Sequence, residues 1–439
     1  MIYYDIKELQ NLLFEAYRNL WERNGNKLMK KMGYLFFALI FQLCRCLPVQ
    51  RRKVVLYNGH HRDLSGNLLV MKQEIMRHRD DVDFYYFGKH SGGAGGLPRK
   101  IGRLFQFFFQ LPFQMATAGQ VFLNDNFLPL GYCRPSERTQ MIQLWHGAGA
   151  FKKFGLSTER NRKVREQVKR ANRRITHLFV TSKQVIPFYS EAFAISYERI
   201  FATGIPVTDI YCDRRGMEQG KNRFLGEYPE LREKKLLLVT PTFRDTPEEN
   251  GELLSRLALE QMEDVLGEDW VILLRMHPKY PIEGFEERER CRNLTGYPHV
   301  SDLYFASEML LTDYSSTMVE YVLLDKPMIF YAYDLEKYSR GFYWDYEEGV
   351  PGPVAHDAEE LLDLVEAAKK DLHGGGESQG SEEDAVSENM GEAWESREPQ
   401  RLGGAAKRER FRRMQYDYAD DASAERIWKV LEGRRKQCR

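Results

Sequence analysis

The chain has 439 residues, of which 43% are hydrophobic and 29% charged, a composition typical of a globular protein with room for two domains. Its 64 basic side chains balance 64 acidic ones, so the net charge gives no reason to expect a nucleic-acid partner. Six cysteines without a C-x-x-C pair argue against a zinc site or a disulfide framework and favour a reducing compartment. No N-terminal stretch has the pattern of a secretory signal, so we do not expect secretion.

The first segment, residues 1–50, is predicted to form helices. Residues 6–21 place leucines on one helical face, and an apolar run at 32–43 follows, with lysines before it and arginines after it. This run is shorter than the roughly 20 apolar residues that a membrane-spanning helix needs. It is therefore either a buried helix or an interfacial helix whose basic flanks meet anionic lipid, and the pattern leaves both open.

From residue 51 onward, short β-rich runs alternate with longer helical stretches. Near-continuous apolar runs are typical of parallel strands covered on both faces, and two series of them predict two doubly wound α/β domains, residues 51–205 and 206–370. A hinge is expected at Gly204-Ile205-Pro206 and the polar stretch 213–222. The predicted strands are 53–57, 83–87, 121–124, 141–145 and 177–181 in the first series, and 235–240, 270–275, 309–312 and 328–331 in the second.

The end of the chain differs in composition from these domains. Residues 371–408 are rich in Gly, Ser and Glu and have little apolar periodicity, which predicts a flexible insertion. This segment contains the glycine triplet 374–376. Residues 409–439 regain an apolar helical pattern and are predicted to form a C-terminal helix.

A strongly basic run lies at residues 159–174, with eight basic and two acidic side chains. Such a run is either a solvated helix face or a site for an anionic partner, such as a phosphate polymer or lipid headgroups. In the second case Arg165 and Lys169 are candidate contacts. No aromatic side chains interleave with these charges, as a single-stranded nucleic-acid platform would require.

Four stretches place polar side chains at the end of a predicted strand, the edge of an open α/β sheet where ligands bind. In the first, His146 follows the strand at 141–145, and Lys152 and Lys153 come soon after. Histidine can accept a proton near neutral pH, which suits a general base, although a lone histidine at a strand end is more often structural. In the second, Arg244 follows the strand at 235–240 and is suited either to bidentate phosphate binding or to a surface salt bridge.

The other two stretches follow the next strands of the second series. In the third, Arg275, His277 and Lys279 lie together, and three donors at one strand end predict an anion site, although chance clustering would also give them. The fourth opens a predicted helix at 317–324, and a serine there would serve as N-cap and leave backbone N–H groups for a phosphate. Capping alone would also explain the serines. The polar residues of this stretch are Thr312, Asp313, Ser315, Ser316 and Glu320.

The four stretches together resemble the motifs of the CDP-glycerol glycerophosphotransferase family, the teichoic acid primases and polymerases. The resemblance covers roughly residues 54–354 and 416–427. It implies a GT-B-like architecture, with two Rossmann-like domains facing across a cleft and the donor nucleotide mainly on the second. It also implies peripheral association with the cytoplasmic face of the membrane. The matching motifs are Trp145-His146-Gly147 with Lys152-Lys153, Pro241-Thr242-Phe243-Arg244, Arg275-Met276-His277-Pro278 and Thr312-Asp313-Tyr314-Ser315-Ser316.

The resemblance also implies a reaction, in which an acceptor hydroxyl attacks the β-phosphorus of CDP-glycerol and CMP leaves. His146 would be the base, and His277 a second catalytic residue. No metal and no cofactor are expected. The remaining predicted contacts are Arg244, Arg275, Thr312, Asp313, Ser315, Ser316 and Glu320 around the donor, and Lys152, Lys153, Arg165 and Lys169 toward a polyol-phosphate or lipid-linked acceptor or an anionic surface.

The sequence leaves two alternatives to this reading. One keeps the chemistry but changes the donor to CDP-ribitol or another nucleotide-polyol or nucleotide-sugar, because phosphate-binding motifs do not read the polyol. The other is a non-catalytic protein at the membrane surface that binds anionic polymer through its basic run. One departure from the family pattern is Val207-Thr208-Asp209, where the family commonly has an arginine before the aspartate.

Overall fold

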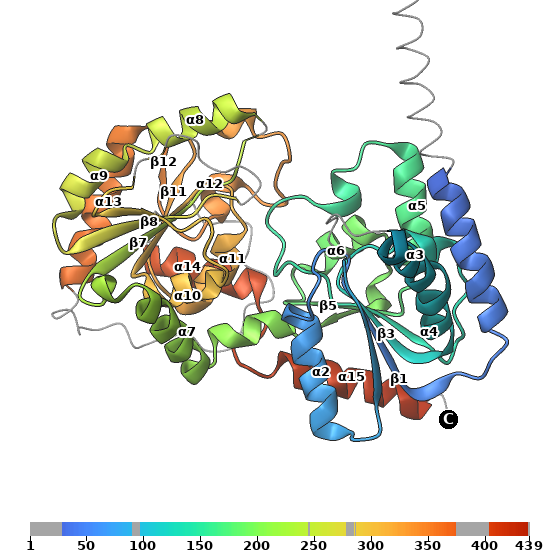
Figure 1. Ribbon diagram of the computed structural model, residues 1–439. Coiled ribbons are helices and arrows are strands. Elements are labelled where there is room, and N and C mark those ends of the chain that lie inside the picture. Colours follow the sequence, from blue (N-terminus) through green and yellow to red (C-terminus); the bar gives the residue numbers. More distant parts are fainter. Residues whose placement is uncertain are drawn as a thin grey trace, which may run out of the picture.

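The computed structural model describes residues 29–89, 97–244, 246–277, 285, 287–374 and 404–437. Within these residues the chain forms two six-stranded parallel sheets with helices packed on them, which lie side by side in Figure 1. This confirms the predicted fold class of two doubly wound α/β domains. The helix predicted at 6–21 lies outside the described residues.

The first domain is built on a sheet with strand order β2-β1-β3-β4-β5-β6. Three consecutive residues of β1, Val54, Val55 and Leu56, have no exposed surface, so both faces of this strand are covered. The strands are β1 (Gln50–Tyr57), β2 (Asp83–Phe87), β3 (Ala118–Leu123), β4 (Gln140–Gln143), β5 (His177–Val180) and β6 (Ile200–Ala202). The helices are residues 29–44, α2 (Gly66–His78), α3 (Leu97–Phe105), α4 (Leu111–Thr117), α5 (Arg162–Asn172) and α6 (Ile186–Phe193).

The second domain repeats the arrangement, with strand order β12-β11-β10-β7-β8-β9. Its central strands β7, β10 and β11 have the predicted bounds. The strands are β7 (Lys235–Thr240), β8 (Trp270–Leu274), β9 (Cys291–Asn293), β10 (Met309–Thr312), β11 (Met328–Tyr331) and β12 (Val354–Ala355). The helices are α7 (Arg214–Glu227), α8 (Pro247–Arg256), α9 (Leu259–Leu266), α10 (Val300–Ala306), α11 (Thr317–Tyr321), α12 (Tyr346–Gly349) and α13 (Ala358–Gly374).

The helix at 29–44 has two different faces. Phe37 and Phe41 are fully buried in the core of the first domain, where Phe37 packs against Phe127 at a ring-centroid distance of 5.4 Å. The opposite face leaves Leu39 and Leu43 more than half exposed. The buried-helix reading therefore holds for one face of this helix, and the interfacial reading of the other face stays a prediction.

The C-terminal segment joins both domains. Helix α14 (Gly404–Gln415) packs on the second domain, where Phe411 is part of the core. Helix α15 (Ser423–Gln437) instead lies along the first domain, beside α2 in Figure 1. Its Ile427 and Leu431 are fully buried against strand residues of the first sheet. Helix α15 therefore forms part of the core of the first domain.

The helices differ from the predicted segment boundaries in three places. The insertion predicted at 371–408 overlaps α13 at one end and α14 at the other, both of which are helical. The C-terminal helix predicted at 409–439 is two helices, because the chain must cross from one domain to the other between them. The polar stretch 213–222, predicted as hinge, is the start of α7, where the side chain of Asp213 accepts a hydrogen bond from Arg215 N–H as N-cap.

Candidate active site

His146 lies at the carboxyl edge of the first sheet, just after β4, and there it meets two residues from neighbouring strand ends. Its Nδ1 is 3.1 Å from Oδ1 of Asp125, which follows β3. The Nε2 of His60, which follows β1, is 3.0 Å from the same carboxylate oxygen. The two imidazole rings stand edge to face with centroids 5.5 Å apart. We call these three side chains the His–Asp–His cluster.

The backbone around the cluster holds its carboxylate in place. Asp125 is nearly buried, and its second oxygen, Oδ2, accepts a hydrogen bond of 2.9 Å from Gly59 N–H. The side chain of Gln143 donates to the backbone carbonyl of Asp125 and accepts from Trp145 N–H, which ties β3 to the loop after β4. Trp145 itself has a φ of +59°, a strained conformation for a bulky residue that turns the chain sharply before His146.

The loop after His146 crosses to the second domain. Lys152 pairs with Phe342 in an antiparallel bridge, and its Nζ lies 3.4 Å from the hydroxyl of Thr242, at the end of β7. Burial lowers the pKa of Lys152 from 10.5 to about 8, against the opposing attraction of Asp313. This lysine therefore links the first domain to the polar strand ends of the second.

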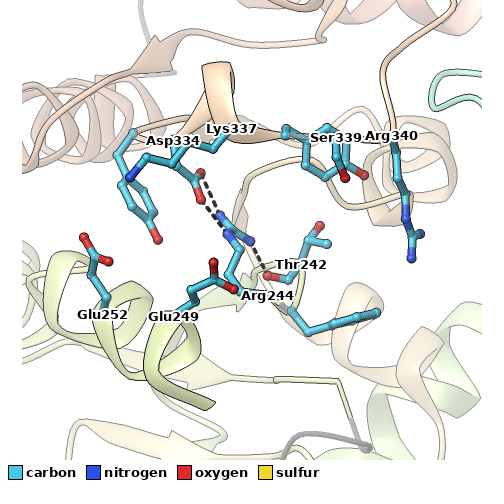
Figure 2. A pocket seen from close by; sticks show the side chains of 11 residues that line it. Thr242, Arg244, Glu249, Glu252, Asp334, Lys337, Ser339 and Arg340 are labelled. Atoms are coloured by element: carbon cyan, nitrogen blue, oxygen red, sulfur yellow. Dashed lines mark hydrogen bonds and ion pairs between the residues drawn. The ribbon is translucent and has the colours of Figure 1, made fainter. Parts of the chain in front are cut away.

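Arg244 is held between carboxylates of its own domain. Its guanidinium donates to both oxygens of Asp334 at 2.6 and 2.9 Å and to Oδ2 of Asp313 at 3.0 Å. Figure 2 shows Arg244 between Asp334 and Thr242. These residues line a cavity of about 170 Å³. Arg244 therefore already has two carboxylate partners within the protein. Its contact with the donor stays a prediction.

The other predicted donor residues divide into those that bind the protein and those that face solvent. Arg275 donates to the carbonyls of Leu294 and Tyr297, and Thr312 donates to the carbonyl of Thr240. These contacts hold loops and strands together. Glu320 accepts a hydrogen bond of 2.9 Å from Tyr211, and burial raises the pKa of its carboxyl.

The two serines of the fourth motif lie at the start of α11. The hydroxyl of Ser315, one residue before the cap position, accepts a hydrogen bond from Thr317 N–H at 3.3 Å. Ser316 occupies the cap position, makes no capping bond with its side chain, and is exposed. Its hydroxyl points to no protein partner among the described residues.

The remaining predicted residues lie apart from these clusters. His277 is exposed, and its ring packs at a tilt against Phe243 with the ring centroids 4.9 Å apart, so the third motif contacts the second. Lys279 lies outside the described residues. Of the predicted acceptor contacts, Lys153 is exposed beside Gly341. Arg165 and Lys169 both lie on α5, and Arg165 donates to the carbonyls of Leu156 and Glu159 in the segment before this helix.

Two residues of the candidate site were not predicted. His60 and Asp125 follow β1 and β3 in the same way that His146 follows β4. A polar residue directly after a buried strand was the pattern used for the four motifs, and it also marks these two positions in Tyr57-Asn58-Gly59-His60 and Leu123-Asn124-Asp125. The adjacency of β1, β3 and β4 in the sheet brings them together.

Comparison with known proteins places the chain in a family. The family described as CDP-Glycerol:Poly(glycerophosphate) glycerophosphotransferase matches residues 39–389. The chain belongs to this family. It is 32% identical over 334 residues to the teichoic acid ribitol-phosphate primase of Bacillus spizizenii, covering 74% of this chain and 85% of that protein. It is 30% identical over 266 residues to the teichoic acid glycerol-phosphate primase of the same organism, covering 59% of this chain and 68% of that protein.

The chain matches some family members over only part of their length. The teichoic acid poly(ribitol-phosphate) polymerase of Bacillus spizizenii is 27% identical over 354 residues, 79% of this chain but 56% of that protein. The solved structure of the wall teichoic acid polymerase TagF superimposes with a TM-score of 0.64 at 21% identity, covering 97% of this chain and 98% of that chain. This similarity shows that the two domains have the predicted GT-B-like fold. Among the described helices, none has both the length and the apolar character needed to cross a bilayer.

Proposed function

We propose that this protein transfers glycerol phosphate from CDP-glycerol to a hydroxyl acceptor and releases CMP, in the synthesis of a teichoic-acid-like polymer. The observation that carries the proposal is the pairing of a half-exposed histidine with a buried carboxylate on one domain, linked by the Lys152 loop to a polar cavity on the other. Membership of the glycerophosphotransferase family supports the same chemistry. His146 and Lys152 are the residues on which it depends most directly.

The proposed reaction is an in-line displacement at the β-phosphorus. As the acceptor oxygen forms its bond to phosphorus, its proton passes to Nε2 of His146, the ring nitrogen that faces away from Asp125. The bond between the β-phosphorus and the bridging oxygen breaks, and that oxygen leaves with CMP. Because charge is spread over phosphoryl oxygens, positioned cations and N–H donors supply most of the stabilisation.

Cations without a protein carboxylate partner are the best candidates for this stabilisation. Lys337 and Arg340 line the polar cavity beside Thr242 and form no ion pair with any residue that the structure describes. Lys152 approaches the same strand end from the first domain. We propose that these three share the donor phosphates with the region of Ser315 and Ser316, and that Arg244 supports the cavity wall from behind. His277 lies beside Phe243, after the neighbouring strand β8. We propose that it contributes to the reaction from this position.

CDP-ribitol is the second candidate donor, and a specific observation favours it. The ribitol-phosphate primase matches more of this chain than the glycerol-phosphate primase does, 74% against 59%. Both donors share the CDP group, so the same phosphate contacts would serve either one. Competition between the two donors for one preparation of enzyme separates these alternatives.

The first experiment is release of CMP from CDP-glycerol by the purified protein with a glycerol-phosphate acceptor, comparing wild type with His146→Ala. A matched control is His356→Ala, which removes an exposed histidine that pairs with Glu347 on the second domain. Loss of about 100-fold or more in the first variant alone is the expected result. Equal release from both variants would reject His146 as the base, and no release from either donor by folded wild type would reject the proposed reaction.

A membrane surface is the proposed location of this reaction, at the cytoplasmic face. An apolar surface patch joins the outer face of the helix at 29–44 to the helices at 101–113, where Phe36 packs edge-on against Phe109 at 5.8 Å. Basic side chains at both ends of the helix at 29–44 would face anionic headgroups. We define the patch by its exposed members, Met32, Leu35, Phe36, Leu39, Leu43, Ile101, Leu104, Phe105, Phe109 and Phe113.

Vesicle flotation tests this location. The double variant Leu39→Glu and Phe105→Glu places two charges in the patch and should abolish binding to vesicles that contain anionic lipid, with CMP release to a soluble acceptor unchanged. Tyr197→Glu is the matched control, because Tyr197 is equally exposed but lies outside the patch. Undiminished flotation of the double variant would contradict the proposed role of the patch.

A further inference from the structure

The His–Asp–His cluster brings two imidazoles onto one carboxylate oxygen. Each short contact to Oδ1 of Asp125 requires a proton on the histidine nitrogen that makes it, Nδ1 of His146 and Nε2 of His60. A neutral imidazole carries one proton, so the other nitrogen of each ring has a free lone pair. For His146 this is Nε2, the nitrogen that a general base needs.

The same three side chains are a donor set that a divalent metal ion would accept. Their donor atoms all lie within 4.8 Å of one another. A metal-binding histidine, however, almost always donates its other ring N–H to a carboxylate or carbonyl. Among the described residues no such acceptor contacts the outer nitrogen of His60 or His146, and the two side chains are 62% and 45% exposed. The arrangement therefore fits hydrogen bonding to Asp125 better than metal binding.

We propose that Asp125 is a positioning residue that holds His146 with its proton on Nδ1, and that His60, bound to the same oxygen, competes with His146 for this carboxylate. This inference rests on the proposed transfer reaction. When His146 takes the acceptor proton it becomes a cation, and the buried carboxylate beside it stabilises that charge. His60 draws on the same carboxylate and, when it is itself protonated, repels the new charge.

Tyr57, at the end of β1, lies close enough to Asp125 to interact with its charge, and burial together with Asp125 raises the pKa of this tyrosine to about 12. Tyr57 therefore stays neutral over the working pH range.

The conservative substitution Asp125→Asn is informative because of the hydrogen bond from Gly59. Gly59 N–H occupies one carboxylate oxygen at 2.9 Å and would select the amide oxygen of an asparagine. The amide N–H₂ group would then face both histidines. A donor at this position selects the wrong tautomer of His146, with its proton on Nε2, and this form cannot act as a base.

The test measures kcat/KM for CMP release from pH 5.5 to 9 by wild type, Asp125→Asn, His60→Ala and the control Asp81→Asn, whose carboxylate is exposed and pairs with Arg79. Asp125→Asn should lose about 100-fold or more, with donor affinity unchanged. Its acid limb should move to lower pH, whereas the acid limb of His60→Ala should move to higher pH. A merely structural role would lower the rate without opposite shifts.

Three results would overturn the inference. Profiles of both variants that coincide with wild type would show that Asp125 and His60 do not act on the base. Shifts in the same direction would show that His60 does not oppose Asp125. One bound metal ion per wild-type chain, lost in Asp125→Asn and required for activity, would replace positioning with ligation. Activity of wild type on CDP-glycerol or CDP-ribitol is measured first, so that failure of the transfer reaction is distinguished from failure of this inference.

Discussion

Replacement of Lys152 by methionine should stabilise the folded protein at neutral pH. The lysine crosses from the first domain to the end of β7, and burial lowers its pKa from 10.5 to about 8. Methionine keeps a flexible apolar stem of similar length beside the ring of Tyr338, over which the amine now lies at 5.4 Å. It loses a long contact of 3.4 Å to Thr242 and the attraction of Asp313.

The direction of the effect follows from proton binding. Between pH 8 and 10.5 the unfolded chain holds a proton on this lysine that the folded chain has released, so the wild type gains stability as the pH rises through this range. Below pH 8 the full cost of the buried charge applies. A pKa shift from 10.5 to about 8 corresponds to about 3 kcal/mol. We expect the Lys152→Met variant to gain about 1–3 kcal/mol at pH 7 and much less near pH 10.

Urea unfolding at pH 7 and pH 9.8, followed by circular dichroism, measures this difference. Lys153→Met is the matched control, because its side chain is exposed and its removal should change the free energy of unfolding by less than about 0.5 kcal/mol. The Lys152→Met variant should also release CMP more slowly, a loss of function in exchange for stability. Equal destabilisation at both pH values would refute the reasoning, since it would mean that the folded protein compensates the charge of Lys152 fully.

Three further substitutions test other buried groups. Asp209 accepts backbone N–H bonds at the start of α15, and burial raises its pKa to about 6, so its charge lowers the stability of the folded protein above that pH. The stability of Asp209→Asn relative to wild type should therefore rise by about 2–3 kcal/mol between pH 4 and pH 7.5, as measured by thermal unfolding. Arg244→Met leaves two carboxylates unpaired and should cost about 3–5 kcal/mol in urea unfolding, and a loss below 1 kcal/mol would contradict this. Leu431→Ala should cost about 2–5 kcal/mol through the first domain, whereas Leu69→Ala on the surface should be neutral.

Most of the strands that the sequence predicted have buried residues on both faces, and the predicted edge strand β2 is five residues long. The three that it missed, β6, β9 and β12, each lie at an edge of a sheet and have two or three residues. Such strands are too short for an apolar run or an alternating pattern to be recognised. Their partners lie elsewhere in the sequence, so pairing with an existing sheet, and not local composition, determines them.

Strand-end polarity placed the residues of the four motifs at the carboxyl edges of the two sheets but could not tell a ligand contact from a protein contact. Arg244 and its partner Asp334 are 90 residues apart, and a cation that awaits a phosphate has the same local sequence as a cation held by a distant carboxylate. The same limit applies to Arg275, whose acceptors are carbonyls in the loop after β9. The crossing of α15 to the first domain was unpredictable for a related reason, since its apolar face specifies burial but not the partner.

The charge cost of Lys152 leads to a prediction about donor binding. A diphosphate placed beside this amine would favour its charged form and raise its pKa from about 8 toward the ordinary value, so the donor should bind together with a proton between pH 8 and 10. Calorimetry of CDP-glycerol binding at pH 9, in two buffers with different ionisation enthalpies, measures this uptake. Wild type should take up a substantial fraction of one proton, and Lys152→Met none. Binding without proton uptake by wild type would mean that the donor phosphates lie away from Lys152, and that the link it makes between the domains is structural only.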